Sequence, residues 1–148
     1  MLPLFASLLI GNVSSITDGD TLKVRDIEGE TKTVRLACID SPERRQRGGL
    51  ESTLSLHKLL PPGQMVEVEI KGRDRYGRTI GLVRVDEKSV NLQLVESGSA
   101  LVYWQHFSPC LGSGYDFYAA QEKARVNALG FWGLPLELQI PPWVWRKK

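Results

Sequence analysis

Two carboxylates in this sequence stand where strands are expected to end, and they could share one metal ion. Asp20 belongs to the segment Asp18-Gly19-Asp20-Thr21, and Asp40 comes at the end of a later strand. Hard cations such as Ca²⁺ take carboxylate and backbone oxygens in irregular geometry, and strand ends far apart in the chain can meet in space. The alternative is an ordinary Asp-Gly turn, which explains Asp20 and Asp40 less well. The pattern therefore favours a site for a hard cation.

Two arginines, Arg35 and Arg78, are candidates for binding an anion. Arg35 shares one face of its expected strand with Ala37 and Ile39. We therefore expect its guanidinium to be half-buried and to need an anionic partner. A guanidinium holds a phosphate through two parallel N–H donors, which lysine cannot do. The alternative is a structural ion pair with a carboxylate of the same region.

Glu43 follows Ser41-Pro42, just beyond the strand that ends at Asp40. A glutamate beside a metal carboxylate can orient or deprotonate a water molecule. The other interpretation is a surface glutamate in a loop. The two histidines, His57 and His106, lack a partner at metal-ligand spacing, and no Ser-His or Cys-His pairing typical of covalent catalysis is visible in the sequence.

The hydrophobic pattern predicts strands first and helices later. The expected strands cover residues 13–17, 21–25, 31–39, 66–70 and 79–85. The expected helices cover residues 50–60, 89–98 and 115–129. Five strands with three helices inserted late favour an α+β fold, a small closed barrel with helices on one side. A doubly wound sheet would instead alternate strands and helices regularly.

Length and composition fit one globular domain. The 148 residues include 42% hydrophobic residues, enough for one core and too many for a disordered chain. No uncharged apolar run approaches the ~20 residues of a membrane helix. The net charge of +2 does not indicate a general polyanion-binding surface. Basic residues do gather in residues 43–47 and 71–78, which suggests a local anion site, with ordinary solvated loops as the alternative.

The chain is expected to have three parts. Residues 1–10 are apolar and form either a shortened leader or an ordinary extension, because a secretory signal also needs a basic start and a small-residue cleavage site. Residues 11–133 hold the expected strands and helices and every candidate site residue. Residues 134–148 are a tail rich in proline and tryptophan with a basic end, and they contain no site motif.

Three motifs occur in a fixed order along the chain. They are DGDT at residues 18–21, RLACIDSPE at residues 35–43 and DRYGR at residues 74–78. Together they resemble the staphylococcal-nuclease-like (thermonuclease) family, and particularly its bacterial branch with the ACID-S/A-PE form. The resemblance covers roughly residues 11–132. Three ordered motifs are far more specific than a lone Asp-Gly-Asp.

The resemblance implies a five-stranded OB-type β-barrel with three helices. It also implies a calcium-dependent endonuclease that hydrolyses the phosphodiesters of DNA and RNA and leaves 3′-phosphates. By motif position, Asp20 and Asp40 are implied as the metal carboxylates, and the carbonyl of Ser41 as a backbone ligand. The family often has threonine where Ser41 stands, a change without consequence if the main chain is the ligand.

The same resemblance assigns roles to the remaining candidates. Glu43 matches the glutamate that contacts the attacking water, and Arg35 and Arg78 match the pair that holds the phosphate. A bound nucleotide is implied to contact a second group of side chains, of which the last two rest on a looser alignment: Arg75, Tyr76, Tyr103 and His106.

A non-catalytic nucleic-acid-binding module is the main alternative function. Barrels of this kind also bind single strands through basic grooves and stacking aromatic side chains. The chain keeps all five candidate positions for metal binding and catalysis, which favours the enzyme. The expected enzyme is a monomer that prefers single-stranded DNA or RNA and has no membrane partner.

The two cysteines, Cys38 and Cys110, can form one bridge or remain free thiols. The resemblance places the loop of Cys110 beside the site, where a bridge would clamp that loop to the barrel. The alternative is a buried free Cys38 that packs as a small hydrophobic side chain. A bridge would fit an extracellular or periplasmic location, while a cytoplasmic location stays open.

Overall fold

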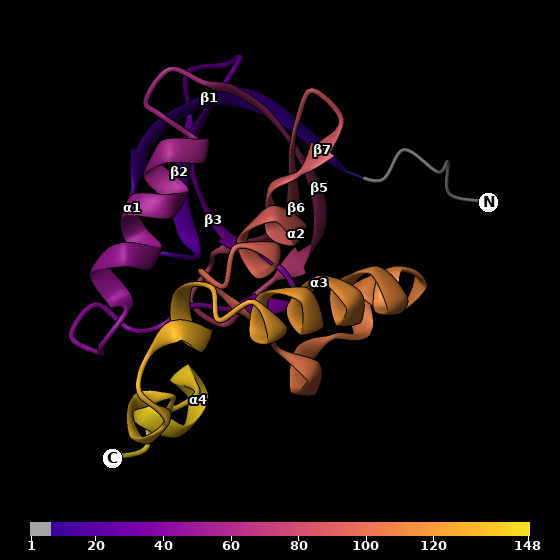
Figure 1. Cartoon of the computed structure of the whole chain (residues 1–148). Coiled ribbons are helices and arrows are strands. Elements are labelled where there is room, and N and C mark those ends of the chain that lie inside the picture. Colours follow the sequence, from indigo (N-terminus) through magenta and orange to yellow (C-terminus); the bar gives the residue numbers. More distant parts are fainter. Residues whose placement is uncertain (1–6) are drawn as a thin grey trace.

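The computed structural model describes residues 7–148, and its first half is a closed β-barrel (Figure 1). The barrel strands are β1 Leu8–Ile16, β2 Thr21–Asp26, β3 Thr31–Leu36, β5 Met65–Arg73 and β6 Thr79–Val85. Neighbouring strands pair antiparallel in the order β3-β2-β1-β5-β6, and a parallel pairing of β3 with β6 closes the barrel. The predicted five-stranded barrel of the α+β class is therefore confirmed.

Short strands and helices pack around the barrel. The short strands are β4 Ile39–Asp40, β7 Lys88–Ser89 and β8 Leu101–Val102. The helices are α1 Gly49–Leu59, α2 Val90–Glu96, α3 Gly114–Val126 and α4 Pro142–Trp145. The first three are the predicted helices, and α4 is an additional short turn. In Figure 1, α1 lies along the barrel, α2 lies between β6 and α3, and α3 and α4 lie below the barrel. Among the described residues, no helix combines the length and the apolar character needed to cross a membrane.

One hydrophobic core joins the barrel to the helices. Alternate residues of a strand face the same side, and on that side Val34, Val68 and Val83 are fully buried. Leu94 of α2 is buried in the same cluster. Gly81 of β6 leaves the space that this packing needs, because a Cβ there would collide with the side chain of Val68.

The strand expected over residues 31–39 is correct for residues 31–36 and wrong beyond them. The chain leaves β3 and turns at Ala37 and Cys38, where Cys38 has a φ of 70°, in the left-handed region. The turn is held from both sides. The N–H of Ala37 donates to the carbonyl of Gly81 at 2.8 Å, and the side chain of the buried Asn91 donates to the carbonyl of Ala37 at 2.9 Å. The residues of this turn are as apolar as those of the strand before it, so the sequence does not indicate where the strand ends.

Strands β1 and β5 are longer than the hydrophobic alternation indicates, and β1 shows the larger difference. β1 begins at Leu8, so the end of the 1–10 segment pairs with β5, and residues 1–6 of that expected leader or extension lie outside the described residues. Leu8 and Ile10 are about half exposed, at 51% and 48%. Leu9 between them packs against the core, so backbone pairing with little burial extends this strand. A run that is apolar on both faces gives no alternation that would reveal it.

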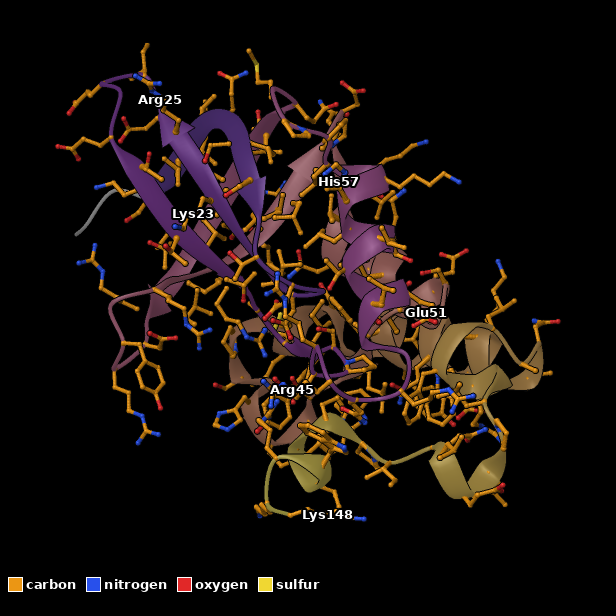
Figure 2. All side chains as sticks on the ribbon, turned by 90° about the vertical axis from the view of Figure 1, so that its left-hand side faces the viewer. Lys23, Arg25, Arg45, Glu51, His57 and Lys148 are labelled. Atoms are coloured by element: carbon orange, nitrogen blue, oxygen red, sulfur yellow. A yellow bond between two sulfur atoms is a disulfide. The ribbon has the colours of Figure 1, made fainter. Side chains whose placement is uncertain are left out.

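The C-terminal residues 134–148 fold back onto the loop between β4 and α1. The side chain of Gln46 in that loop donates to the carbonyl of Ile140. The ring of Trp143 in α4 stacks on Tyr103, with centroids 5.2 Å apart and an interplanar angle of 8°. Figure 2 shows Arg45 of the same loop and Lys148 toward the same end of the molecule. The tail is thus packed against the body of the domain.

Cys38 and Cys110 form a disulfide with their Cα atoms 6.5 Å apart, so the bridge is present rather than two free thiols. The bond closes a loop across a sequence separation of 72 residues and ties the 108–113 segment to the turn after β3. Both half-cystines are buried.

Replacing both cysteines with alanine should lower the free energy of unfolding by about 2–4 kcal/mol, because the unfolded chain loses a constraint over a long loop. Urea unfolding of the oxidised protein and the double variant measures this difference. Adding a reductant should destabilise the wild-type protein and leave the variant unchanged. Two free thiols in the oxidised wild-type protein, found by mass spectrometry, would contradict the bridge.

Candidate active site

A cleft of about 870 Å³ opens beside β4 and the turn that joins β5 to β6. It collects nine of the ten side chains that the sequence singles out, so the structure brings the three motifs together. These nine residues are Asp20, Arg35, Asp40, Glu43, Arg75, Tyr76, Arg78, Tyr103 and His106. The tenth, Ser41, is buried next to Asp20.

Asp20 is fixed by its neighbours before any ligand binds. Gly19 permits this approach, because a Cβ at that position would lie 2.7 Å from Ser41 Oγ. The backbone N–H and the hydroxyl of Ser41 both donate to Asp20 Oδ2, at 2.9 and 3.0 Å. The hydroxyl of Thr21 donates to Asp20 Oδ1 at 3.0 Å. These hydrogen bonds fix the orientation of the Asp20 carboxylate.

Asp40 reaches the same place from the other side of the turn. It ends β4, where it pairs with Leu101 of β8, and it is 1% exposed. The β3–β4 turn and the β4–β8 pairing together carry this carboxylate to the floor of the cleft.

Arg35 connects the two carboxylates. Its Nη2 atom lies 3.4 Å from Asp20 Oδ2 and 3.4 Å from Asp40 Oδ1. Its Nη1 atom donates to the carbonyls of Leu36 and Ile39. The side chain is 14% exposed, so the half-buried guanidinium and its ion pair are both present. The carbonyls hold the guanidinium in place at the border of the cleft.

Burial, neighbouring charges and hydrogen bonds together set the pKa values of these carboxylates. Burial alone would raise the pKa of Asp20, but Arg35 and the hydrogen bonds from Ser41 outweigh it and lower that pKa. Burial raises the pKa of Asp40, and the hydrogen bonds from Arg146 oppose this effect. Burial, and then the charge of Asp20, raise the pKa of Asp18 to about 6. Of these three carboxylates, Asp20 is the one whose pKa is lowered.

Arg146 enters this site although the tail containing it carries no site motif. Its guanidinium donates to both oxygens of Asp40, at 3.0 and 2.6 Å, and to Glu43 Oε1 at 2.6 Å. Hydrogen bonds to Asp40 and then to Glu43 raise the pKa of Arg146, so this group is charged. A contact across about a hundred residues leaves no local pattern that sequence reasoning could find.

Arg78 lies on the opposite wall, at the β5–β6 turn. Its Nε atom donates to Asp74 Oδ2 at 2.7 Å, and Asp74 also accepts from the backbone N–H groups of Tyr76 and Arg78. The guanidinium carbons of Arg75 and Arg78 lie 4.9 and 5.5 Å from the centre of the Tyr76 ring. This turn presents two cations and one aromatic ring to the cleft.

The second aromatic group is only partly open to a ligand. His106 packs edge-on against Tyr103 at 4.6 Å, and Trp143 covers a face of the Tyr103 ring. Both Tyr103 and His106 still line the cleft. The stacking partner from the tail is a feature that the motifs do not reveal.

The atoms at the floor of the cleft that could bind a metal ion are oxygens. Among residues 7–148, no group of three or more His, Cys, Asp or Glu side chains is arranged to hold a metal ion. The two buried carboxylates Asp20 and Asp40 do approach one guanidinium nitrogen, and the backbone N–H of Ser41, the residue after Asp40, donates to Asp20. Two carboxylates with backbone and solvent oxygens fit a hard cation such as Ca²⁺, and do not fit a thiolate- or imidazole-binding metal.

Comparison with known proteins agrees with this fold. The family model described as staphylococcal nuclease homologue matches residues 33–133. An "Uncharacterized endonuclease" of Escherichia coli O157:H7 is 36% identical over 99% of this chain and 90% of its own. The "Micrococcal nuclease" of Shigella flexneri is 34% identical over 93% of this chain and 80% of its own.

The chain belongs to the staphylococcal nuclease homologue family. A further relative, an "Uncharacterized endonuclease" of Haemophilus influenzae, is 34% identical over 92% of this chain and 72% of its own. The family places the protein among the nucleases, and its chemistry is the hydrolysis of phosphodiester bonds in nucleic acid.

Proposed function

We propose that this protein is a calcium-dependent endonuclease that cleaves DNA and RNA at the 5′ P–O bond and leaves 3′-phosphates. The observation that carries the proposal is the arrangement around Arg35, whose Nη2 atom lies 3.4 Å from each of the two buried carboxylates at the floor of the cleft. This arrangement supports the proposal, because the carboxylate oxygens can bind a cation beside a guanidinium that can donate to phosphate. Single-stranded substrate is preferred, because bases inside a duplex cannot stack on Tyr76 or Tyr103.

Different residues would bind the cation, bind the phosphate and transfer the proton. Asp20, Asp40 and the carbonyl of Ser41 would hold the cation, which supplies Lewis-acid polarisation of the phosphoryl oxygen when bound. Arg35 and Arg78 donate N–H groups to the equatorial phosphate oxygens, where negative charge grows in the transition state.

In this proposal Glu43 orients the attacking water or accepts its proton. It lies at the edge of the cleft, in the loop that follows β4, and its backbone N–H donates to the side chain of Gln46 at 3.0 Å. Water attack in line with the leaving 5′-oxygen needs no covalent intermediate on the protein.

Digestion of plasmid DNA and of RNA in Ca²⁺, in Mg²⁺ and in a chelator tests the proposal. Cleavage should be strong in Ca²⁺ and much weaker in Mg²⁺, since Mg²⁺ demands a tighter octahedral cage and keeps its waters. It should stop in the chelator, and the products should carry 3′-phosphates. Full activity in the chelator would overturn the metal assignment, and equal rates on a GC-rich duplex and its separated strands would overturn the strand preference.

Glu43→Gln should lower kcat by more than it weakens binding of a nucleotide bisphosphate inhibitor. The amide keeps the shape of the carboxylate and loses its capacity to accept a proton. Comparing single-turnover rates with inhibitor Kd measures the two effects separately. If rate and binding fall together, Glu43 maintains the shape of the site and does not handle the water.

An extracellular or periplasmic location is part of the same proposal. Disulfides persist in oxidising compartments, and the Cys38–Cys110 bridge supports such a location. Cell fractionation of the native host followed by detection of the protein tests it, and recovery of reduced protein in the cytoplasm would contradict it.

A further inference from the structure

Arg146 lies on the carboxylates of the cleft, yet it comes from the last turn of the chain. Its two terminal nitrogens engage both oxygens of Asp40, and one of them also donates to Glu43. A guanidinium that engages both oxygens of one carboxylate forms the strongest type of side-chain ion pair. Such a pair is a specific contact rather than a chance meeting of surface charges.

The contact is presented by a packed segment. Trp143, three residues before Arg146, stacks on Tyr103, and the carbonyl of Ile140 accepts a hydrogen bond from Gln46. Tyr103 and Gln46 belong to two different elements that border the cleft. The segment therefore approaches the cleft in a defined orientation, and Figure 2 shows its end, Lys148, at the same end of the molecule as the loop that carries Arg45.

Arg146 and a hard cation would need the same oxygens. Asp40 is 1% exposed and Arg146 donates to both of its oxygens, so a cation that binds these oxygens must replace this guanidinium. Arg35 already places one positive charge 3.4 Å from this carboxylate. A second guanidinium brings the local positive charge to two, and a divalent cation at the same oxygens meets its repulsion.

We propose that Arg146 is an internal counter-ion of the active site, which neutralises Asp40 and Glu43 and competes with the divalent cation for the oxygens of Asp40. The inference rests on the proposed cation site at Asp20 and Asp40. It makes the C-terminal segment a regulator of cation affinity: binding of the cation displaces Arg146 from Asp40, and the segment lowers the affinity of the site by the strength of its own ion pair.

Calorimetric titration with Ca²⁺ tests the competition without any measurement of activity. Arg146→Gln keeps a long polar side chain and removes the charge. It should bind Ca²⁺ at least about tenfold more tightly than the wild-type protein. Arg146→Lys keeps the charge and should stay closer to wild type. In a chelator, Arg146→Gln should melt at a lower temperature than wild type, because Asp40 loses its partner, and saturating Ca²⁺ should narrow that difference.

Lys147→Gln is the matched control, because it removes the same formal charge from the adjacent, exposed residue, which makes no ion pair among residues 7–148. Its Ca²⁺ affinity should stay within about twofold of wild type. Wild-type or weaker Ca²⁺ binding by Arg146→Gln would overturn the counter-ion role.

Asp20→Asn separates this result from a failure of the proposed function. If Asp20→Asn abolishes Ca²⁺ binding while Arg146→Gln binds Ca²⁺ no more tightly than wild type, the cation site stands and the counter-ion inference fails. If Asp20→Asn binds Ca²⁺ as the wild-type protein does, or no variant binds it, both fail together.

Discussion

Replacing Arg35 with lysine should reduce the rate of phosphodiester cleavage at least about 100-fold and leave the fold intact. Removal of one preorganised donor to a developing oxyanion costs a factor of this size. The structure adds a second reason, because Arg35 makes its contacts with two nitrogens at once: Nη1 donates to two carbonyls while Nη2 faces the carboxylates. A lysine has one nitrogen and cannot satisfy the carbonyls and a phosphate together.

Arg25→Lys provides the control for this substitution. Arg25 is exposed on the neighbouring strand β2, and Figure 2 shows it at the rim of the barrel away from the loop of Arg45. Its replacement should leave kcat and the melting temperature unchanged. A turnover number for Arg35→Lys close to that of the wild-type enzyme would remove Arg35 from the catalytic groups and leave it as a structural partner of Asp20 and Asp40.

The barrel could be predicted from sequence because alternation of buried and exposed residues is a local signal. Thr79–Val85 is a strand in both the prediction and the structure. The helix expected from residue 89 is α2, which Ser89 caps with a hydroxyl that accepts from the N–H of Leu92. The candidate site could be predicted because ordered motifs place its residues at strand ends, and strand ends of one barrel meet.

The parts that sequence reasoning missed depend on contacts between distant segments. The turn at Cys38 lies inside an unbroken apolar run, and it is held by Asn91, which is buried and satisfies three backbone groups. Arg146 meets Asp40 across 106 residues. Asn91 could have been noticed only as an asparagine on the buried face of a helix, since a buried amide must have hydrogen-bond partners. Nothing in the tail marks Arg146.

Asp20→Asn should lower the cleavage rate by about 100- to 1,000-fold and abolish detectable Ca²⁺ binding. A cation acting as a Lewis acid contributes several kcal/mol to the stabilisation of transition-state charge, and each 1.36 kcal/mol is a factor of ten. The amide oxygen of asparagine can still accept hydrogen bonds from Ser41, but it lacks the negative charge that attracts the cation. Steady-state kinetics over a range of Ca²⁺ concentrations, together with calorimetric titration, measure both effects.

Asp116→Asn is the control for removing a carboxylate charge by the same substitution. Asp116 is exposed in the first turn of α3 and does not line the cleft. It should bind Ca²⁺ and cleave DNA as the wild-type protein does. Asp20→Asn should also remain folded, because the amide oxygen can still accept from Ser41, and the hydroxyl of Thr21 can turn to accept from the amide nitrogen. If excess Ca²⁺ restores the full rate of Asp20→Asn, Asp20 contributes only to affinity. If its rate is unchanged at every Ca²⁺ concentration, the cation is held elsewhere and the two carboxylates beside Arg35 serve only as its ion-pair partners.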